Sequence, residues 1–286
     1  MVALVVLVVG LLALGWAALA GVRAVGGDKT APPTTTTRQR AKPERPLRIV
    51  FPEGFTRRQM AERITAVNEI ARTRRKVRTR LVPTQYLAAT RRHRLPGRFA
   101  RDGVARPLEG FLFPATYEFT KRTRAKQLVA RQLEAFGRAW ATVDLRYARS
   151  RNLTPYDVLI IGSLVEEETF VPAERRLVAA VIYNRLRRRM PLQIDATTRY
   201  GLNVPATEPL RRSQLESNNP YNTRRRLGLP PTPITNPGLA SMRAAAHPAR
   251  VDYLYFVRKP DKRSHFFTAS EAEFLRKACE YGFGCS

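Results

Sequence analysis

Acidic residues are scarce in this 286-residue chain, which has 23 aspartates and glutamates against 51 lysines and arginines, a formal net charge of +28. A field of this sign favours acidic partners such as nucleic acid, anionic lipid headgroups or anionic wall polymers. The same excess also fits a chain that simply uses arginine on its solvated faces. No aromatic RNA-binding strand and no zinc-ligand spacing accompanies the basic runs, so we expect no nucleic-acid partner.

Cysteine is scarce as well: the two cysteines, Cys279 and Cys285, both lie near the C-terminus. Their spacing fits neither a zinc site nor a redox-active Cys-x-x-Cys motif. If this end of the chain is extracytoplasmic, the pair could close a small disulfide loop, and otherwise they are two unrelated thiols. The sequence leaves both alternatives open.

Several common catalytic signatures are missing. The chain contains no Gly-x-Gly-x-x-Gly, no phosphate-binding Gly-Lys-Ser/Thr loop, no His-Glu-x-x-His and no Gly-x-Ser-x-Gly elbow. Its three histidines, His93, His247 and His265, are far apart and show no metal-ligand pattern. We therefore expect neither a bound metal nor a cofactor.

A long apolar run opens the chain. Residues 2–22 carry no charge and consist almost wholly of valine, leucine, alanine and glycine. About 20 such residues cross a bilayer as a helix. A cleaved signal peptide is the alternative, although its apolar stretch is typically about 7–15 residues long and follows a basic segment. We expect a transmembrane anchor at residues 1–27 and a linker rich in proline and threonine at residues 28–46.

The body that follows is predicted to be of mixed α+β class. Residues 47–120 are interpreted as a small α+β module, with a short first strand and then a helix that is capped by Thr56 and runs through Ile64. A returning strand is expected at residues 111–119. Residues 121–286 are predicted to form a second, catalytic domain.

The clearest helix signal begins at Thr154. Thr154 at the N-cap, Pro155 after it and Asp157 at the third helical position make a capping box. The next eight residues are almost all apolar, which predicts a helix buried on most sides. This helix ends in three adjacent glutamates, Glu166–Glu168.

Three carboxylates at a helix C-terminus are unexpected in so basic a chain. The negative end of the helix dipole, burial and like-charge neighbours all raise a carboxyl pKa there. A carboxyl that is still protonated near neutral pH is what a general acid requires. Helical phase favours Glu168 as the most desolvated of the three. The alternative is that these glutamates pair with Arg175 and Arg176 on the surface.

From about residue 109 onward, an ordered series of motifs resembles the YceG-like family of endolytic murein transglycosylases. The matching stretches are 109–117 (EGFLFPATY), 163–169 (SLVEEET), 178–186 (VAAVIYNRL), 190–197 (MPLQIDAT), 200–202 (YGL), 220–223 (PYNT), 228–234 (GLPPTPI), 236–241 (NPGLAS), 246–249 (AHPA) and 253–257 (YLYFV). Any one of these is weak, but the full set in this order covers more than half of the chain.

The resemblance implies an enzyme that cleaves the bond between N-acetylmuramic acid and N-acetylglucosamine within a glycan strand, leaving 1,6-anhydro ends. The family pattern usually reads Val-Glu-Lys-Glu-Thr, and its second, catalytic glutamate corresponds to Glu168. Glu167 stands where the family commonly has lysine, which should push the pKa of Glu168 upward. The resemblance also implies that residues 47–120 form a LysM-like module.

Seven polar residues within the matched motifs are candidates for a sugar-binding groove. They are Gln193, Asp195, Thr197, Tyr200, Tyr221, Asn222 and Asn236. Amides, carboxylates and phenol hydroxyls suit ligands that are rich in hydroxyl and acetamido groups. Each residue alone could equally serve a cap or a turn, and Asp195 and Asn236 in particular look like helix N-caps.

The expected partners follow from the same resemblance. They are peptidoglycan glycan strands, membrane lipid around the N-terminal helix and, as a further candidate, peptidoglycan synthases. Because the substrate lies outside the cell, we expect a single-pass protein of the cell membrane with an extracytoplasmic body. The alternative, from another functional class, is a non-catalytic membrane-anchored protein that binds cell wall or anionic polymer.

Overall fold

The computed structural model describes residues 44–95, 97–99 and 104–283. The predicted anchor at residues 1–27, all but the last three residues of the predicted linker, and Cys285 lie outside these ranges. From Glu44 onward the chain forms one compact unit. Within the described ranges, no helix is both long enough and apolar enough to span a bilayer.

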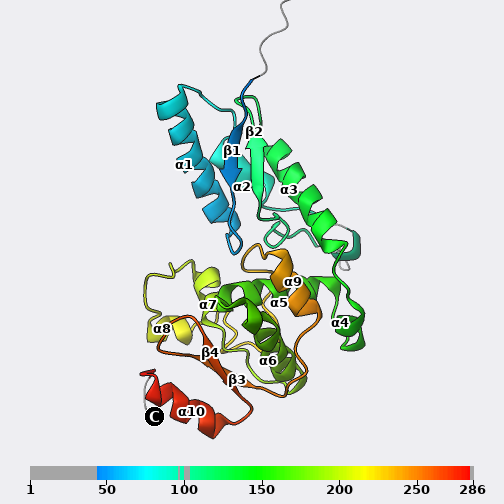
Figure 1. Ribbon diagram of the computed structural model, residues 1–286, viewed down its shortest axis with the longest axis vertical. Helices are drawn as coiled ribbons and strands as arrows, with labels where there is room; N and C mark the ends of the chain where they lie inside the picture. Colours follow the sequence, from blue (N-terminus) through cyan, green and yellow to red (C-terminus); the bar gives the residue numbers. More distant parts are fainter. Residues whose placement is uncertain (1–43, 96, 100–103, 284–286) are drawn as a thin grey trace, which may run out of the picture. The chain divides into compact units, whose positions relative to one another are not determined.

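Two short antiparallel strands frame the first part of this unit (Figure 1). β1 (Leu47–Val50) pairs with β2 (Thr116–Phe119), and burial alternates along both strands because one face of the pair is packed and the other is solvated. The segment between them holds α1 (Arg57–Arg75), α2 (Pro83–Ala89) and the 3-10 turn η1 (Gly97–Phe99). The predicted mixed α+β class is confirmed.

The first helix is longer than the sequence indicated. Thr56 caps α1 as predicted, with its hydroxyl accepting the Gln59 N–H at 3.2 Å and the Gln59 carboxamide accepting the Thr56 N–H at 2.7 Å. The prediction that the helix stops near Ile64 is wrong. The residues that follow contain neither glycine nor proline, so the helix continues until Lys76 ends it in a left-handed conformation, at a φ of 55°.

The returning strand, in contrast, is shorter than predicted. Only β2 forms out of the expected residues 111–119. Phe111 and Leu112 lie instead in a wholly buried turn that follows Gly110, whose φ is 88°. Pro114 has no N–H for a strand ladder and stands just before the strand begins.

α5 (Pro155–Glu168) is the central helix of the second part and packs against α6 (Arg175–Arg187) and α9 (Leu239–Ala246). The predicted capping box is present, because the Thr154 hydroxyl accepts the Asp157 N–H at 3.1 Å and the Asp157 carboxylate accepts the Thr154 N–H at 2.7 Å. Every residue from Val158 to Val165 is buried. The prediction of a helix buried on most sides is therefore confirmed.

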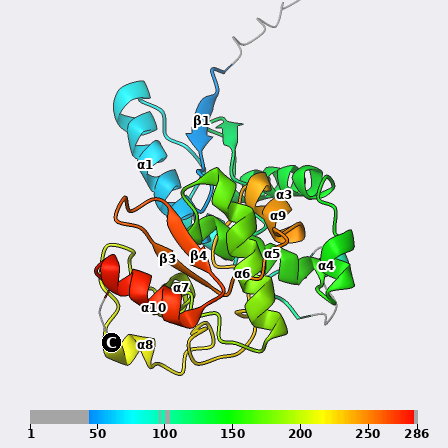
Figure 2. The same cartoon turned by 60° about the horizontal axis from the view of Figure 1, so that its bottom comes forward.

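Further elements surround this helical centre (Figure 2). They are α3 (Ala125–Trp140), α4 (Arg146–Ser150), η2 (Pro172–Glu174), α7 (Asp195–Leu202), α8 (Arg212–Leu215), the hairpin of β3 (Tyr255–Arg258) with β4 (His265–Thr268), and α10 (Glu271–Glu280). The N-caps of α7 and α9 are Ile194 and Gly238, so the cap roles suggested for Asp195 and Asn236 are wrong. Cys279 in α10 is disulfide-bonded.

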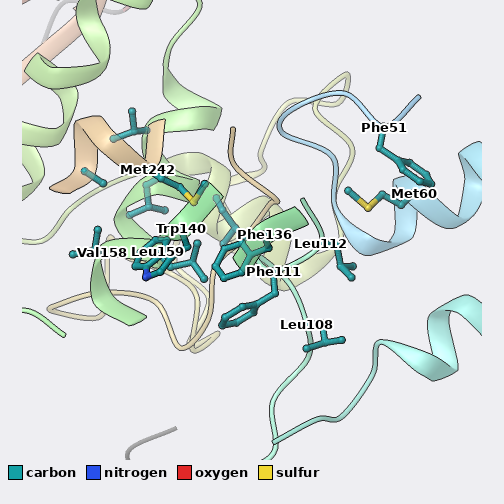
Figure 3. Packing of buried hydrophobic residues seen from close by; sticks show 14 of the residues in the cluster. Phe51, Met60, Leu108, Phe111, Leu112, Phe136, Trp140, Val158, Leu159 and Met242 are labelled. Carbon is teal, nitrogen blue, oxygen red and sulfur yellow. The ribbon is translucent and has the colours of Figure 1, made fainter. Parts of the chain in front are cut away.

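One hydrophobic cluster runs through both parts of the unit (Figure 3). Phe111 and Phe136 stand edge to face with centroids 5.0 Å apart, and Phe136 stacks on Trp140 at 5.7 Å. α3, which carries these last two rings, packs against both α2 and α9. The first part therefore shares its core with the second, and the domain boundary predicted at residue 120 stays a prediction.

Gly110 offers a test of this packing. A Cβ added there would lie 2.6 Å from Cγ of Pro233, and the φ of 88° disfavours any side chain. We expect Gly110→Ala to lower the free energy of unfolding by about 2–4 kcal/mol, measured by urea denaturation. Gly137→Ala is the matched control, because a Cβ on this α3 residue meets nothing within 4 Å. It should raise stability by up to about 1 kcal/mol, and equal midpoints for the two variants would contradict the packing described.

Candidate active site

Glu168 is the last residue of α5, at the end of its buried stretch. Desolvation by the surrounding protein raises the pKa of this carboxyl to about 7, while the charge of Arg258 lowers it and that of Asp195 raises it. Among the described residues, none donates a hydrogen bond to the carboxyl group, so no contact stabilises its ionised form directly. Near neutral pH a large share of Glu168 is therefore protonated, as a general acid requires.

Glu167, the neighbouring residue, behaves as part of a carboxyl pair. Its pKa is also raised to about 7, first by desolvation and then by the charges of Glu168, Glu166 and Glu109. The residue as a whole is exposed, so water reaches part of the side chain. The sequence predicted that Glu167 would raise the pKa of Glu168; burial is instead the main cause at Glu168, and the mutual repulsion raises the pKa of Glu167.

Glu166 has a structural contact. Its carboxylate accepts the backbone N–H of Gly238 at 2.9 Å, which ties the end of α5 to the start of α9. Glu53 approaches Gly238 from the β1–α1 turn so closely that a Cβ at this glycine would lie 1.8 Å from the Glu53 carboxylate. Burial and the Glu166 charge raise the pKa of Glu53, and Arg175 lowers it.

The alternative that the three glutamates are surface partners of nearby arginines is not supported. Arg175 donates to the Ser241 hydroxyl at 3.2 Å, and Arg176 donates to the His247 carbonyl at 2.9 Å. Among the residues that the structure describes, neither arginine forms an ion pair with Glu166–Glu168.

A fourth carboxyl, Glu109, lies on the other side of the site and is only 2 % exposed. One oxygen accepts the Arg57 N–H at 2.9 Å and the Asn236 amide at 2.8 Å, and the other accepts the Tyr200 hydroxyl at 3.1 Å. Desolvation raises the pKa of Glu109 to about 7 against the opposing charge of Arg57 and these hydrogen bonds. Glu109 thereby connects the first part of the unit to α7 and to the loop before α9.

The side chain of Asn236 adds further hydrogen bonds between the same segments. Its side-chain oxygen accepts the backbone N–H groups of Gly110 and Leu112, both at 2.9 Å. Its amide donates to the Phe55 carbonyl at 2.8 Å, in addition to Glu109. The side chain is wholly buried and has a protein partner in every direction.

A cleft of about 600 Å³ opens between these groups. Glu109 and Glu167 line it together with Arg57, Tyr200 and Tyr221. The two tyrosine rings lie 5.1 Å apart, and the Tyr221 hydroxyl is 2.8 Å from that of Thr232. Two of the seven predicted groove residues, Tyr200 and Tyr221, therefore line a cleft beside the glutamate cluster.

A larger cavity, of about 790 Å³, lies at the opposite, N-terminal end of α5. Its lining includes Tyr147, Arg151 and Asp157 but none of the carboxyls with a raised pKa. Because acid–base chemistry needs such a group, the candidate active site is the C-terminal end of α5 and not the larger cavity.

The other predicted groove residues separate into two groups. Asp195 is half exposed, lies close enough to Glu168 to influence its pKa, and pairs with Arg224 at 2.7 Å. Gln193 holds a φ of 54°, and its side chain accepts a bond from buried Arg185 at 3.3 Å. Both residues are accessible to solvent, Gln193 fully and Asp195 in part.

Thr197, Asn222 and Asn236 differ from the expectation, because all three are wholly buried. The Thr197 hydroxyl donates to the Ile194 carbonyl at 2.6 Å, and the Asn222 amide donates to the carbonyls of Leu215 and Ser217. Side chains that are enclosed and already bonded cannot reach a sugar. The expectation that they contact sugar is wrong for this reason: they are positioning residues, which hold the segments around the cleft.

Sequence reasoning did not assign a role to Glu109, Glu53 or Arg258. Glu109 opens the first matched motif, which was the available signal, but its partners Tyr200 and Asn236 lie far along the chain. No local pattern indicates such a long-range contact.

Comparisons with known proteins identify the family of this chain. A family model described as the YceG-like family matches residues 29–280. The chain belongs to the YceG-like family. An endolytic murein transglycosylase of Bacillus subtilis (strain 168) is 36% identical over 156 residues, which are 54% of this chain and 43% of that protein. One from Streptococcus pneumoniae (strain ATCC BAA-255 / R6) is 31% identical over 265 residues, which are 84% of this chain and 46% of that protein.

A solved structure of this family shares the fold. A YceG-like protein of Listeria monocytogenes superposes with a TM-score of 0.65 at 30% sequence identity, covering 80% of this chain and 75% of that one. The chain spans less than half the length of the curated relatives it matches.

The Asn236 network can be tested through stability. We expect Asn236→Ala to lower the free energy of unfolding by about 3–5 kcal/mol, because two buried N–H groups would lose their partner and the Phe55 carbonyl and the Glu109 carboxyl would each lose one of their donors. Asn218→Ala is the matched control, since the side chain of Asn218 is exposed and, within the described ranges, accepts a hydrogen bond from Arg226 alone. Denaturant unfolding measures both, and a loss below 1 kcal/mol for Asn236→Ala would refute the network's importance.

Proposed function

We propose that this protein is a lytic transglycosylase that cuts the bond between N-acetylmuramic acid and N-acetylglucosamine in peptidoglycan strands. The observation that carries the proposal is Glu168, a carboxyl with a pKa raised to about 7 at the end of a buried helix. The curated relatives named endolytic murein transglycosylases support the substrate class.

One carboxyl suffices for this chemistry. Protonated Glu168 gives its proton to the glycosidic oxygen as the bond from C1 of the muramoyl ring to that oxygen breaks. The resulting carboxylate takes the proton of the C6 hydroxyl, whose oxygen bonds to C1 of the same ring and closes a 1,6-anhydro sugar. Glu168 is protonated again, no water is consumed, and the intramolecular nucleophile has a high effective concentration. An ordinary glycosidase would need two carboxyls.

The accessible groove residues then hold the strand. Tyr200 and Tyr221 supply aromatic surface and hydroxyls at the cleft, Asp195 lies close enough to Glu168 to influence its pKa, and the exposed Gln193 is a further candidate contact. Thr197, Asn222 and Asn236 support them from the interior. The first part of the unit, for which a LysM-like identity is proposed, contributes Arg57 and Glu109 to the same cleft.

The cellular setting is part of the proposal. Residues 2–22 are apolar and uncharged, as a membrane anchor requires. With peptidoglycan as substrate, the body lies outside the cytoplasm, where peptidoglycan synthases are candidate partners.

The role of Glu168 is tested by Glu168→Gln, which keeps the size of the side chain but cannot donate a proton as an acid. We expect the rate of glycan-strand cleavage to fall by at least about 10²–10⁴-fold, because one group serves both proton transfers. Mass spectrometry of the wild-type digest should show anhydromuramoyl ends. Glu134→Gln, which alters an exposed α3 glutamate paired with Arg138, is the control and should cleave normally.

Two outcomes would contradict this mechanism. One is a folded Glu168→Gln protein that cleaves at nearly the wild-type rate. The other is a wild-type digest in which reducing muramoyl ends, the products of hydrolysis, predominate.

The raised pKa of Glu168 predicts how stability depends on pH. The folded protein binds this proton more tightly than the unfolded chain, so the stability contributed by the protonated group is complete below the ordinary pKa of 4.5 and is lost as the pH rises through about 7. Glutamine does not ionise. We therefore expect Glu168→Gln to gain stability relative to wild type between pH 4.5 and 8, measured by urea unfolding. Parallel curves across this range would show that the pKa is not raised.

A further inference from the structure

A dense group of basic residues lies far along the chain from Glu168. We define the basic end as residues 44–48, 69–80 and 118–126, which together hold twelve arginines and lysines against three glutamates. This short part of the chain carries a net charge of +9, about a third of the +28 of the whole sequence. A charge density of this kind needs a physical account beyond the average basicity of the chain.

The three segments of the basic end meet in space. The Arg75 guanidinium donates to the Pro46 carbonyl at 3.3 Å, the Arg80 N–H donates to the Lys121 carbonyl at 2.9 Å, and the Lys121 N–H donates to the Glu44 carboxylate at 3.1 Å. Figure 1 shows the end of α1, the start of β1 and the end of β2 at the same end of the first part. The charges therefore form one surface.

Few of these charges are neutralised within the protein. Glu69 pairs with Arg72 at 2.7 Å, and Glu118 pairs with Arg48 at 3.0 Å. The remaining basic residues are exposed, and among the described residues none of them forms an ion pair. They are Arg45, Arg74, Arg75, Lys76, Arg78, Arg80, Lys121, Arg122, Arg124 and Lys126.

Apolar side chains lie within the same surface. A groove of about 480 Å³ is lined by Arg45, Arg48 and Arg75 together with Val67 and Ile70. Ile70 is 52% exposed, although it is a large aliphatic residue in the middle of a helix. Arginines around exposed aliphatic groups suit the interface of a bilayer, where headgroups take the charge and the acyl boundary takes the apolar atoms.

The position of this surface in the chain favours the membrane as its partner. The described unit begins at Glu44, within the basic end, and only 21 residues separate it from the apolar run at residues 2–22. Even fully extended, a segment of that length spans at most about 75 Å. A segment inserted at residues 2–22 would therefore hold the basic end near the bilayer, at a high effective concentration.

We propose that the basic end docks on the anionic phospholipid headgroups of the membrane next to the chain's own N-terminal segment. Headgroup attraction acts only within a Debye length, about 8 Å at physiological ionic strength, so docking brings this face into contact with the surface. The contact would fix which way the cleft faces relative to the membrane. The proposal rests on the membrane anchor of the proposed function and on the charge of this surface, and it does not depend on the chemistry proposed for Glu168.

The test uses the full chain reconstituted in vesicles. A donor dye on Thr73→Cys, in the basic end, is paired with an acceptor dye on lipid headgroups. We expect energy transfer to be higher in vesicles of phosphatidylcholine with 30% phosphatidylglycerol than in phosphatidylcholine alone, and to fall to the phosphatidylcholine level in about 0.5 M salt because the charges are screened.

A pair of charge-matched variants makes the test specific. The combined substitutions Arg74→Gln, Arg78→Gln, Arg80→Gln and Arg122→Gln remove four exposed charges whose side chains have no recorded hydrogen bond among the described residues. This variant should lower the ratio of docked to undocked protein at least about tenfold. The control removes as many charges elsewhere, through Arg188→Gln, Arg189→Gln, Arg225→Gln and Arg250→Gln, and should dock like wild type.

Three results would overturn the proposal. The first is equal energy transfer in the two kinds of vesicle. The second is an equal loss in both variants, which would mean that only total charge matters. The third is binding of soluble inorganic polyphosphate at the basic end without any effect of phosphatidylglycerol, which would indicate an anionic polymer and not the membrane. Thermal melts of both variants confirm that each is folded.

Discussion

The buried amide of Asn236 is the contact on which the arrangement of the site depends. It bonds the backbone at Phe55, Gly110 and Leu112 and also the carboxyl of Glu109. These groups come from the turn before α1 and from the segment before β2, and Asn236 itself lies in the loop before α9. An amide has two donors and two acceptor lone pairs, and here all four are used, so the side chain fixes three distant segments in one geometry. Without this side chain, the segments that carry Glu109 and Arg57 into the cleft would not be held in place.

The burial of Glu168 explains why its carboxyl can stay protonated in so basic a protein. The net charge of +28 should lower every carboxyl pKa, and Arg258 does so at Glu168. Charges farther away than about 8 Å are screened by salt, whereas desolvation acts on the group itself. Burial at the end of α5 therefore outweighs the field of the whole chain.

How far the sequence could predict this structure depends on the range of the contacts involved. α5 was predictable because Thr154, Pro155 and Asp157 act within one turn and the apolar run follows directly. Asn236 was misread as an N-cap because its residue type suits a cap, while its four real partners lie more than a hundred residues away. Thr197 and Asn222 were misread for a related reason. A polar residue in a matched motif can serve the ligand or the scaffold, and only burial distinguishes the two.

The buried carboxyl of Glu109 joins the two parts of the unit at the cleft. A carboxyl that is 2 % exposed is costly to bury unless it is hydrogen-bonded, and the three donors around Glu109 supply those bonds. Two of the donors, Tyr200 and Asn236, belong to the second part of the unit, and the third is the first residue of α1. The buried carboxyl of Glu109 receives all three hydrogen bonds only when the two parts of the unit are packed together as they are here. The burial of Glu109 thus makes the cleft that it lines a product of the whole fold, so that neither part alone would hold the tyrosines and the glutamate cluster in place.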